Sequence, residues 1–190
     1  MIRRYFDVLD ESVIDNIRNY LESNLDKPIW TSSSFWQEEL IRSSSIISIC
    51  NVNDKGIVDS VKNTIENILD VNFDELDFEF VCQLYLWSRM SYITWHDDKT
   101  YPYNGTIYLN KDWNMNDGGI FLWMDNQTRE IKGIEPLYNT MVVNSHSDND
   151  PCNSHCVTSI VPDVLESRIT IQWRAKNARR KKDKSGFDYQ

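Results

Sequence analysis

Two stretches within the first 75 residues carry apolar side chains at helical spacing. One follows Asp10 and the other follows Asp54, and in both the apolar positions recur three and four residues apart. They are Val13, Ile14, Ile17, Tyr20 and Leu21 in the first stretch and Ile57, Val58, Val61, Ile65, Ile68 and Leu69 in the second. Such positions share one face of a helix, and aspartate is a favoured N-cap residue. The pattern predicts two helices whose apolar faces pack against a sheet.

From Phe78 onward the apolar spacing becomes that of β-strands, with side chains alternating between two faces up to Leu86. The run Asp117-Gly118-Gly119 is the clearest turn signal. Further strands are expected near residues 45–52, 92–96, 105–110, 119–124, 139–144, 155–160 and 168–174. Many short strands after two helices favour an α+β, mainly β fold. The expected core is a double-stranded β-helix, a jelly-roll or cupin-like barrel, braced by N-terminal helices.

The length of 190 residues favours a single domain. We expect it to span residues 1–175, with helical support in 1–75, the barrel in 76–175 and a basic tail in 176–190. Hydrophobic residues at 41% and aromatic residues at 12% exclude an intrinsically disordered chain. The N-terminus lacks the apolar core of a signal peptide, and no stretch approaches the ~18 apolar residues of a membrane span. A soluble, cytoplasmic protein with no membrane partner is expected.

Charge is unevenly distributed along the chain. Residues 174–184 hold seven of the 20 basic residues and one of the 29 acidic ones, so the remainder holds 13 basic and 28 acidic residues, a net charge of −15. An acidic surface is poorly suited to neutralising phosphates, which makes a nucleic-acid partner unlikely. The basic tail is interpreted as a solvated extension, with contact to an anionic partner as the alternative.

Four cysteines do not form the disulfide framework of a small secreted protein at this length. Cys50 and Cys82 lie in apolar runs and are expected in the core. Cys152 and Cys156 flank His155, which leaves open a zinc loop completed by His146. A structural zinc site usually needs a second ligand pair with knuckle-like spacing, and the chain has none. The zinc interpretation is therefore the weaker one.

The run Thr94-Trp95-His96-Asp97-Asp98 carries the strongest candidate chemistry. On a strand the side chains of His96 and Asp98 share a face, while Asp97 points away. A distant histidine would complete a facial triad of two imidazoles and one carboxylate, the ligand set of non-haem Fe(II) oxygenases. Arg168 follows His155 by 13 residues, enough for a return along a neighbouring strand, and its guanidinium could clamp a carboxylate.

A series of further motifs follows in order and at matching spacing. The series is Tyr108-Leu109-Asn110-Lys111-Asp112-Trp113, Asp117-Gly118-Gly119-Ile120, Ile134-Glu135-Pro136, His155-Cys156-Val157 and Arg168 to Trp173. Together with the His96-x-Asp98 motif it resembles the catalytic domain of the 2-oxoglutarate- and Fe(II)-dependent prolyl 4-hydroxylases. The run from Tyr108 to Trp113 is most similar to the oxygen-sensing prolyl hydroxylases. The resemblance covers roughly residues 80 to 175.

The resemblance implies a residue set for each cofactor. His96, Asp98 and His155 would bind Fe(II), with His155 preferred over His146 because of its His-x-Val context. Arg168, Tyr108 and Thr170 would contact the distal carboxylate of the co-substrate 2-oxoglutarate, although Tyr108 and Thr170 also suit ordinary strand packing. Tyr85 matches the family tyrosine that precedes the metal motif if one extra residue is allowed. O2 would be the oxidant, and the resemblance leaves room for ascorbate.

The resemblance implies a prolyl 4-hydroxylase that acts on a proline-containing peptide or protein. A hydroxylase of a free amino acid or another small-molecule substrate is the alternative, and a non-catalytic cupin-like binding module is an alternative of another class. Two departures from the family are a missing glycine turn in the run Trp87 to Tyr92 and a spacing from Arg168 to Trp173 one residue short of the oxygen-sensing subgroup.

Three segments are the candidates for selecting the substrate: residues 30–36, which could form a lid or a simple loop, the loop 99–104, and the basic tail. Within the first two, Trp36, Tyr101 and Tyr103 could pack on a pyrrolidine ring or simply anchor their loops.

Overall fold

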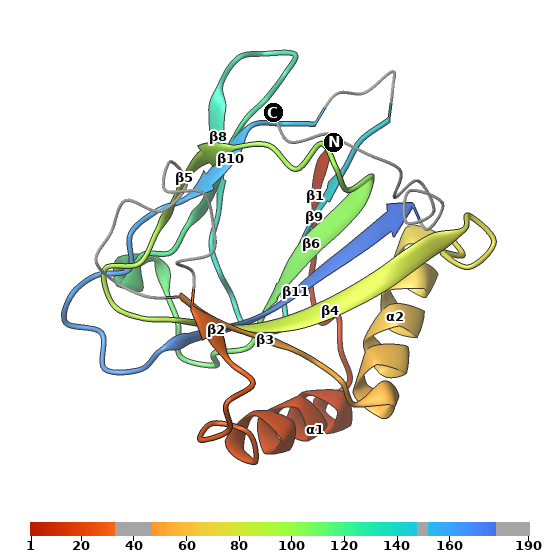
Figure 1. Ribbon diagram of the computed structural model, residues 1–190. Helices are drawn as coiled ribbons and strands as arrows, with labels where there is room; N and C mark the ends of the chain where they lie inside the picture. Colours follow the sequence, from red (N-terminus) through yellow and green to blue (C-terminus); the bar gives the residue numbers. More distant parts are fainter. Residues whose placement is uncertain (33–46, 148–151, 178–190) are drawn as a thin grey trace, which may run out of the picture.

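The computed structural model describes residues 1–32, 47–147 and 152–177. Two antiparallel sheets face each other in it (Figure 1). The larger sheet has the strand order β1 (Ile2–Tyr5), β9 (Met141–Ser145), β6 (Tyr103–Tyr108), β11 (Arg168–Asn177), β4 (Phe78–Trp87), β3 (Ile47–Asn51) and β2 (Thr31–Ser32). The smaller sheet has the order β5 (Ile93–His96), β10 (His155–Val157), β7 (Phe121–Met124) and β8 (Ile131–Ile134). This architecture confirms the predicted double-stranded β-helix.

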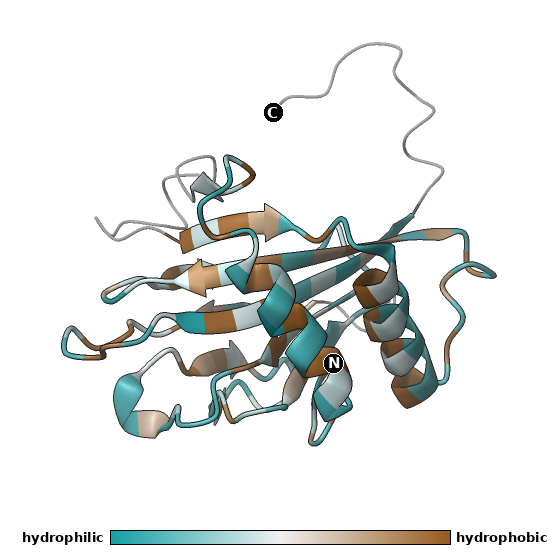
Figure 2. Cartoon of the chain, turned by 90° about the horizontal axis from the view of Figure 1, so that it is seen from below, coloured by the Kyte–Doolittle hydropathy of each residue, from teal (hydrophilic) through white to brown (hydrophobic). Residues whose placement is uncertain are grey.

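Helices α1 (Glu11–Glu22) and α2 (Lys55–Leu69) cover the face of the larger sheet that is turned away from the smaller sheet (Figure 1). Along both helices hydrophobic and hydrophilic residues alternate in the way expected of amphipathic helices (Figure 2). The Asp54 side chain accepts a hydrogen bond from the Ile57 backbone N–H at 3.0 Å, which confirms the predicted cap. Asp10 occupies the N-cap position of α1 without a side-chain cap bond.

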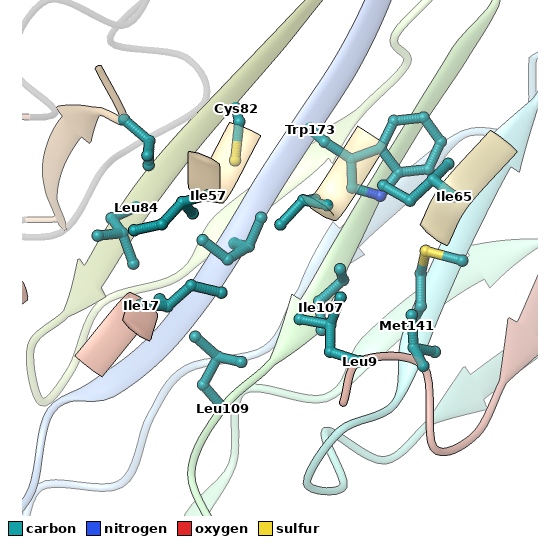
Figure 3. Packing of buried hydrophobic residues seen from close by; sticks show 14 of the residues in the cluster. Leu9, Ile17, Ile57, Ile65, Cys82, Leu84, Ile107, Leu109, Met141 and Trp173 are labelled. Carbon is teal, nitrogen blue, oxygen red and sulfur yellow. The ribbon is translucent and has the colours of Figure 1, made fainter. Parts of the chain in front are cut away.

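The main core lies between the two helices and the larger sheet (Figure 3). Strand β11 shows how the chain builds it, because Ile171, Trp173 and Ala175 are fully buried on the helix side. Their neighbours Gln172 and Arg174 point to the other face, into the space between the sheets. The strand alternation therefore separates a structural face from a face that can carry chemistry.

Three strands have no counterpart in the sequence prediction: β1, β2 and β8. β1 pairs with β9, so that Ile2 lies opposite Asn144. The predicted strand at 119–124 begins only at Phe121, because Gly118 and Gly119 both have positive φ, and the one predicted at 155–160 ends at Val157. β11 continues to Asn177, two residues into the segment expected to be the tail.

Tyr103 corrects an expectation about the substrate loop. It lies on β6 rather than in a loop, and its ring packs edge-on against Phe73 at 5.7 Å in the main core. Tyr103 is therefore a packing residue on the face away from the second sheet. Trp36 and most of the predicted lid, residues 33–36, lie outside the described residues, as does the tail from 178 to 190.

None of the helices in the described ranges combines the length and the apolar character that crossing a membrane requires.

Candidate active site

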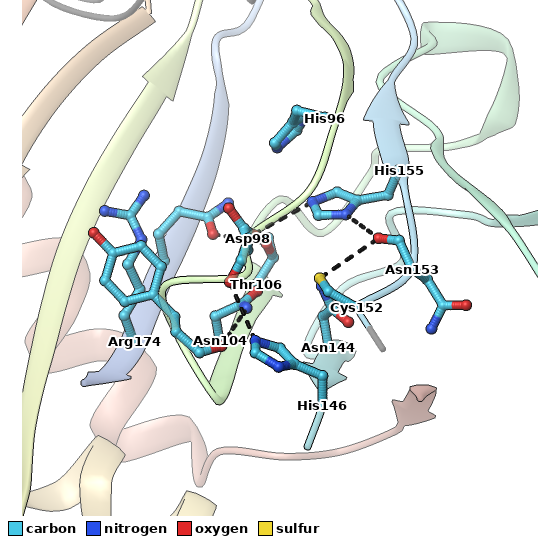
Figure 4. Close-up of polar contacts among 12 residues, drawn as sticks. His96, Asp98, Asn104, Thr106, Asn144, His146, Cys152, Asn153, His155 and Arg174 are labelled. Carbon is cyan, nitrogen blue, oxygen red and sulfur yellow. Dashed lines mark hydrogen bonds and ion pairs between the residues drawn. The ribbon is translucent and has the colours of Figure 1, made fainter. Parts of the chain in front are cut away.

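His96, Asp98 and His155 converge on one point of the smaller sheet (Figure 4). His96 ends β5, Asp98 follows two residues later, and His155 begins β10 directly opposite His96 in the antiparallel register. One ligand atom from each of the three lies within 4.8 Å of the others. Asp97 points elsewhere and forms an ion pair with Lys99 at 2.8 Å. The pairing of β5 with β10 and the chain just beyond the end of β5 thus assemble the triad.

Backbone carbonyl groups hold both imidazole rings. His96 Nδ1 lies 2.8 Å from the Thr94 carbonyl oxygen, and His155 Nδ1 lies 3.0 Å from that of Asn153. A carbonyl oxygen only accepts hydrogen bonds, so each Nδ1 carries a proton, and in the neutral ring Nε2 then keeps a free lone pair. Metal-binding histidines are usually oriented in this way. The two Nε2 atoms are therefore ready to act as ligands.

The electrostatics of the site favour a neutral His96 and an ionised Asp98, the states in which these two residues bind a metal. Burial lowers the pKa of His96, and the neighbouring His155 lowers it further. Burial alone would raise the pKa of Asp98, but the hydrogen bond and charge of His155, together with His96 and Arg174, lower it overall. The contact between His155 Nε2 and Asp98 Oδ2 measures 3.4 Å. A carboxylate beside a neutral imidazole is the form that binds a divalent cation.

The triad opens into a cavity of about 180 Å³ between the two sheets. The smaller sheet and the chain following β5 contribute the triad and Phe121, while strands β4, β6 and β11 of the larger sheet contribute Tyr85, Trp87, Tyr108, Arg168 and Arg174, among others. The volume corresponds to about six water molecules at the density of the liquid. A small organic anion fits such a space.

Arg168 is fully buried in the wall of this cavity, at 1% exposure. Its guanidinium lies over the Trp87 ring at 4.1 Å and over the Tyr108 ring at 5.7 Å. One terminal nitrogen donates to the Gly119 carbonyl, while Nε has no hydrogen-bond partner among the described residues. Burial lowers the pKa of Arg168 to about 10, so the group stays charged at neutral pH. A buried cation with an unmet donor fits a carboxylate ligand.

Tyr108, Thr170 and Tyr85 differ in their relation to the cavity. Tyr108 lines it beside Arg168, and burial raises the pKa of its hydroxyl to about 12. Thr170 is not among the lining residues, because its hydroxyl accepts a hydrogen bond from Trp87 Nε1 at 3.0 Å. Thr170 therefore fixes the indole ring of Trp87, over which the Arg168 guanidinium lies. Tyr85 lines the cavity near Asp98, and its hydroxyl accepts from Arg174 Nη2 at 2.9 Å.

Four further residues of the site escaped the sequence prediction: Trp87, Gly119, Gln172 and Arg174. The signal for Gln172 and Arg174 was present, because they follow Arg168 by four and six residues and thus share its strand face. Trp87 was noted only as the start of a run that lacks the family's glycine turn, but it is the last residue of β4 and pairs with Arg168.

The alternative zinc loop does not form among the residues that the structure describes, where the triad is the only cluster able to hold a metal. Cys152 Sγ accepts a hydrogen bond from Asn144 Nδ2 at 3.2 Å. His146 was expected to be solvated, yet it is half-buried, and its Nε2 lies 3.3 Å from the Asp98 carbonyl oxygen. It borders the triad without joining it.

No family model matches the chain, and no curated protein matches its sequence. Solved structures do match. A prolyl-4-hydroxylase from Pseudomonas putida is 15% identical with a TM-score of 0.68, over 93% of this chain and 92% of that one. A prolyl hydroxylase from Trichoplax adhaerens, solved with a hypoxia-inducible-factor peptide fragment, is 12% identical with a TM-score of 0.71, over 97% and 87%.

An oxidoreductase of the 2OG-Fe(II) oxygenase family from Burkholderia pseudomallei is 14% identical with a TM-score of 0.60, over 93% of this chain and 84% of that one. At these identities the likeness concerns the fold. The chain has the fold of the 2-oxoglutarate- and Fe(II)-dependent oxygenases, the prolyl 4-hydroxylases among them, and it carries a His-x-Asp…His triad on the sheet where His155 faces His96.

Proposed function

We propose that this protein is a 2-oxoglutarate- and Fe(II)-dependent hydroxylase. The observation that carries the proposal is the presence of the triad and the buried Arg168 in one cavity. A metal site alone would suit many functions, and a buried arginine alone is often structural. Together they provide a site for a divalent cation and a site for the far end of a dicarboxylate.

The residues divide the work between binding and orientation. His96, Asp98 and His155 would hold Fe(II) as a facial set, which leaves adjacent coordination positions open. Arg168 would hold the distal carboxylate of 2-oxoglutarate, with the Tyr108 hydroxyl as a further donor. The Trp87 ring packs on Arg168 and the Phe121 ring on His155, so apolar rings border both binding positions. Bound Fe(II), 2-oxoglutarate and O2 would supply the oxidising chemistry.

For the substrate, we propose a proline residue in a peptide or protein, which would make the enzyme a prolyl 4-hydroxylase. Support comes from the ordered motif series between Tyr108 and Trp173, and from two of the three solved structures described above being prolyl hydroxylases by description. Tyr101 also lines the cavity near Asp98 and offers an aromatic face to a pyrrolidine ring. A free amino acid is the second candidate, and the charge of Arg174 in the cavity favours it.

The test is the Fe(II)-dependent conversion of 2-oxoglutarate to succinate by the purified protein, measured with proline-containing peptides, with free proline and with other amino acids. The proposal predicts succinate formation that requires Fe(II), and a gain of one oxygen atom on proline in a treated peptide. Oxygen found only on a free amino acid would reject the peptide substrate and leave the hydroxylase in place. A protein that binds metal yet neither binds nor converts 2-oxoglutarate would reject the hydroxylase and favour the cupin-like binding module.

A further inference from the structure

Arg174 is a second cation in the same cavity, and the proposed chemistry makes no use of it. It lies on β11 six residues after Arg168 and on the same strand face, so the two Cα atoms are about 20 Å apart along the strand. Arg168 is fully buried at one end of this row of β11 side chains. Arg174 is half-buried at the other end, on the Asp98 side of the cavity (Figure 4).

Neutral groups hold the guanidinium of Arg174 in place. Its Nη2 donates to the Tyr85 hydroxyl at 2.9 Å, its Nη1 to Gln83 Oε1 at 3.3 Å, and its central carbon lies 5.1 Å from the centre of the Tyr101 ring. Within the part of the chain that the structure describes, no carboxylate forms an ion pair with it. These contacts orient the cation without a direct ion pair, and the nearby Asp98 carboxylate acts on it only through space.

The position of Arg174 is that of an entrance residue. A second, more open hollow along β4 shares Tyr101 and Arg174 with the cavity. Lys176, the next residue on the same strand face, lines only this second hollow and pairs with Glu79 at 3.5 Å. A molecule that enters by this route therefore meets Arg174 before it reaches the triad.

The charges that line the cavity leave room for one more carboxylate. Among the described residues, the ionised side chains in its lining are the Asp98 carboxylate and the guanidinium groups of Arg168 and Arg174, which carry one net positive charge. Fe(II) and doubly ionised 2-oxoglutarate would cancel each other and leave that charge in place. An uncompensated charge in a partly desolvated cavity is unfavourable, so a ligand that places a carboxylate beside Arg174 is the complementary occupant.

We propose that Arg174 binds a carboxylate of the substrate, so that the enzyme acts on carboxylate-bearing molecules anchored at the cavity entrance with the oxidised carbon toward the triad. This inference rests on the proposed hydroxylase function and narrows its substrate class. The planar guanidinium suits two parallel hydrogen bonds to a carboxylate. Two sources fit this chemistry: the α-carboxylate of a free amino acid, and an acidic residue beside the target residue of a peptide.

The experiment compares matched pairs of ligands on protein loaded with Mn(II) and 2-oxoglutarate, so that binding is measured without turnover. Isothermal titration would follow each common amino acid against its amide, N-acetylproline against N-acetylprolinamide, and a proline peptide with a neighbouring Asp against the same peptide with Asn. A charge-assisted hydrogen bond predicts a carboxylate preference of about tenfold to a hundredfold in at least one pair. A preference among free amino acids identifies the α-carboxylate as the source, and a preference only in the peptide pair identifies the acidic neighbour.

Substitutions at Arg174 and Lys176 test whether Arg174 causes the carboxylate preference. Arg174→Gln should abolish it, Arg174→Lys should retain part of it, and Lys176→Gln, which removes the same charge two residues further along the same face, should leave it unchanged. Arg174→Lys also serves if Arg174→Gln does not fold, because it keeps the charge and loses the planar fork. Equal binding within every pair, binding of no probe at all, or a preference that survives both Arg174 variants would overturn the proposal. Uncoupled turnover of 2-oxoglutarate by the wild-type protein, measured alongside, tests the hydroxylase function separately.

Discussion

Gly119 and Arg168 approach each other so closely that a side chain at position 119 would have to displace the guanidinium. A Cβ atom added to Gly119 would clash with Arg168 Nη1, and the backbone there has φ of +68°. The Gly119 carbonyl is also the acceptor that holds the guanidinium. The glycine turn of the sequence is therefore part of the anion site, since its backbone occupies the space beside the buried cation.

This contact predicts that Gly119→Ala displaces Arg168. We expect the dissociation constant for 2-oxoglutarate to rise by at least about tenfold, with a loss of stability of about 1–3 kcal/mol from the strained backbone. Titration of the Mn(II)-loaded protein measures the first effect and urea unfolding the second. Gly133→Ala is the matched control, because an added Cβ there meets only the end of the Leu122 side chain, at 3.1 Å. Equal effects of the two substitutions would argue against the contact.

Arg168 itself should control co-substrate binding without controlling the metal. We expect Arg168→Met to lower 2-oxoglutarate affinity by several kcal/mol and to leave Mn(II) affinity within about threefold, because the guanidinium does not contact the triad. Arg168→Lys should bind 2-oxoglutarate with intermediate affinity, since it keeps the charge and loses the fork. If 2-oxoglutarate affinity were unchanged in both variants, another basic residue would have to bind the co-substrate.

Thr170 offers a test between two roles. If Thr170 contacts 2-oxoglutarate directly, its loss should mainly reduce the affinity for 2-oxoglutarate. If Thr170 serves as the acceptor for Trp87 Nε1, its loss should mainly reduce the stability of the protein. We expect Thr170→Val to cost about 1–3 kcal/mol of unfolding free energy, because a buried indole N–H loses its partner. Thr170→Ser should restore most of that stability. A large fall in 2-oxoglutarate affinity with unchanged stability would support the direct contact instead.

Cys82 makes the stability of the protein sensitive to alkaline pH. Burial raises the pKa of its thiol to about 12, while an unfolded cysteine titrates near 8.5. The stability that depends on the neutral thiol is therefore fully present below the unfolded pKa and is lost as the pH rises toward 12. Between pH 8 and 10.5, wild-type protein should lose about 2 kcal/mol more than Cys82→Ala, measured by urea unfolding. Parallel pH curves for the two proteins would show that Cys82 is not the responsible group.

Local pattern predicts much of the site, and strand register supplies the rest. The His96-x-Asp98 spacing and the alternation along β11 are local features, so the shared facing of His96 and Asp98 and that of Arg168 could be predicted from the residues alone, whereas His155 was chosen over His146 by the family resemblance. The partner of Thr170 could not, because Trp87 reaches it only through the pairing of β4 with β11, whose residues are more than 80 positions apart.

Strand β1 and the position of Tyr103 were also missed because they depend on contacts between distant parts of the chain. β1 has no strong local strand pattern, and its pairing with β9 joins residues about 140 positions apart. Tyr103 was placed in a loop because Pro102 and Asn104 are typical of turns, yet its ring packs against Phe73 and draws the residue into β6. Tertiary packing overrides local preference in both cases.

The central claim is that His96, Asp98 and His155 form an Fe(II) site that works with 2-oxoglutarate. The most direct measurement is Fe(II)-dependent succinate formation by three proteins: the wild type, Asp98→Ala and Asp97→Ala. Each variant removes one aspartate carboxylate, and the two positions are adjacent in the chain. Only Asp98 points toward the histidines, while Asp97 pairs with Lys99. We predict activity in the wild type, near-wild-type activity in Asp97→Ala, and loss of both metal binding and activity in Asp98→Ala. Equal losses in the two variants, or full activity in Asp98→Ala, would contradict the account.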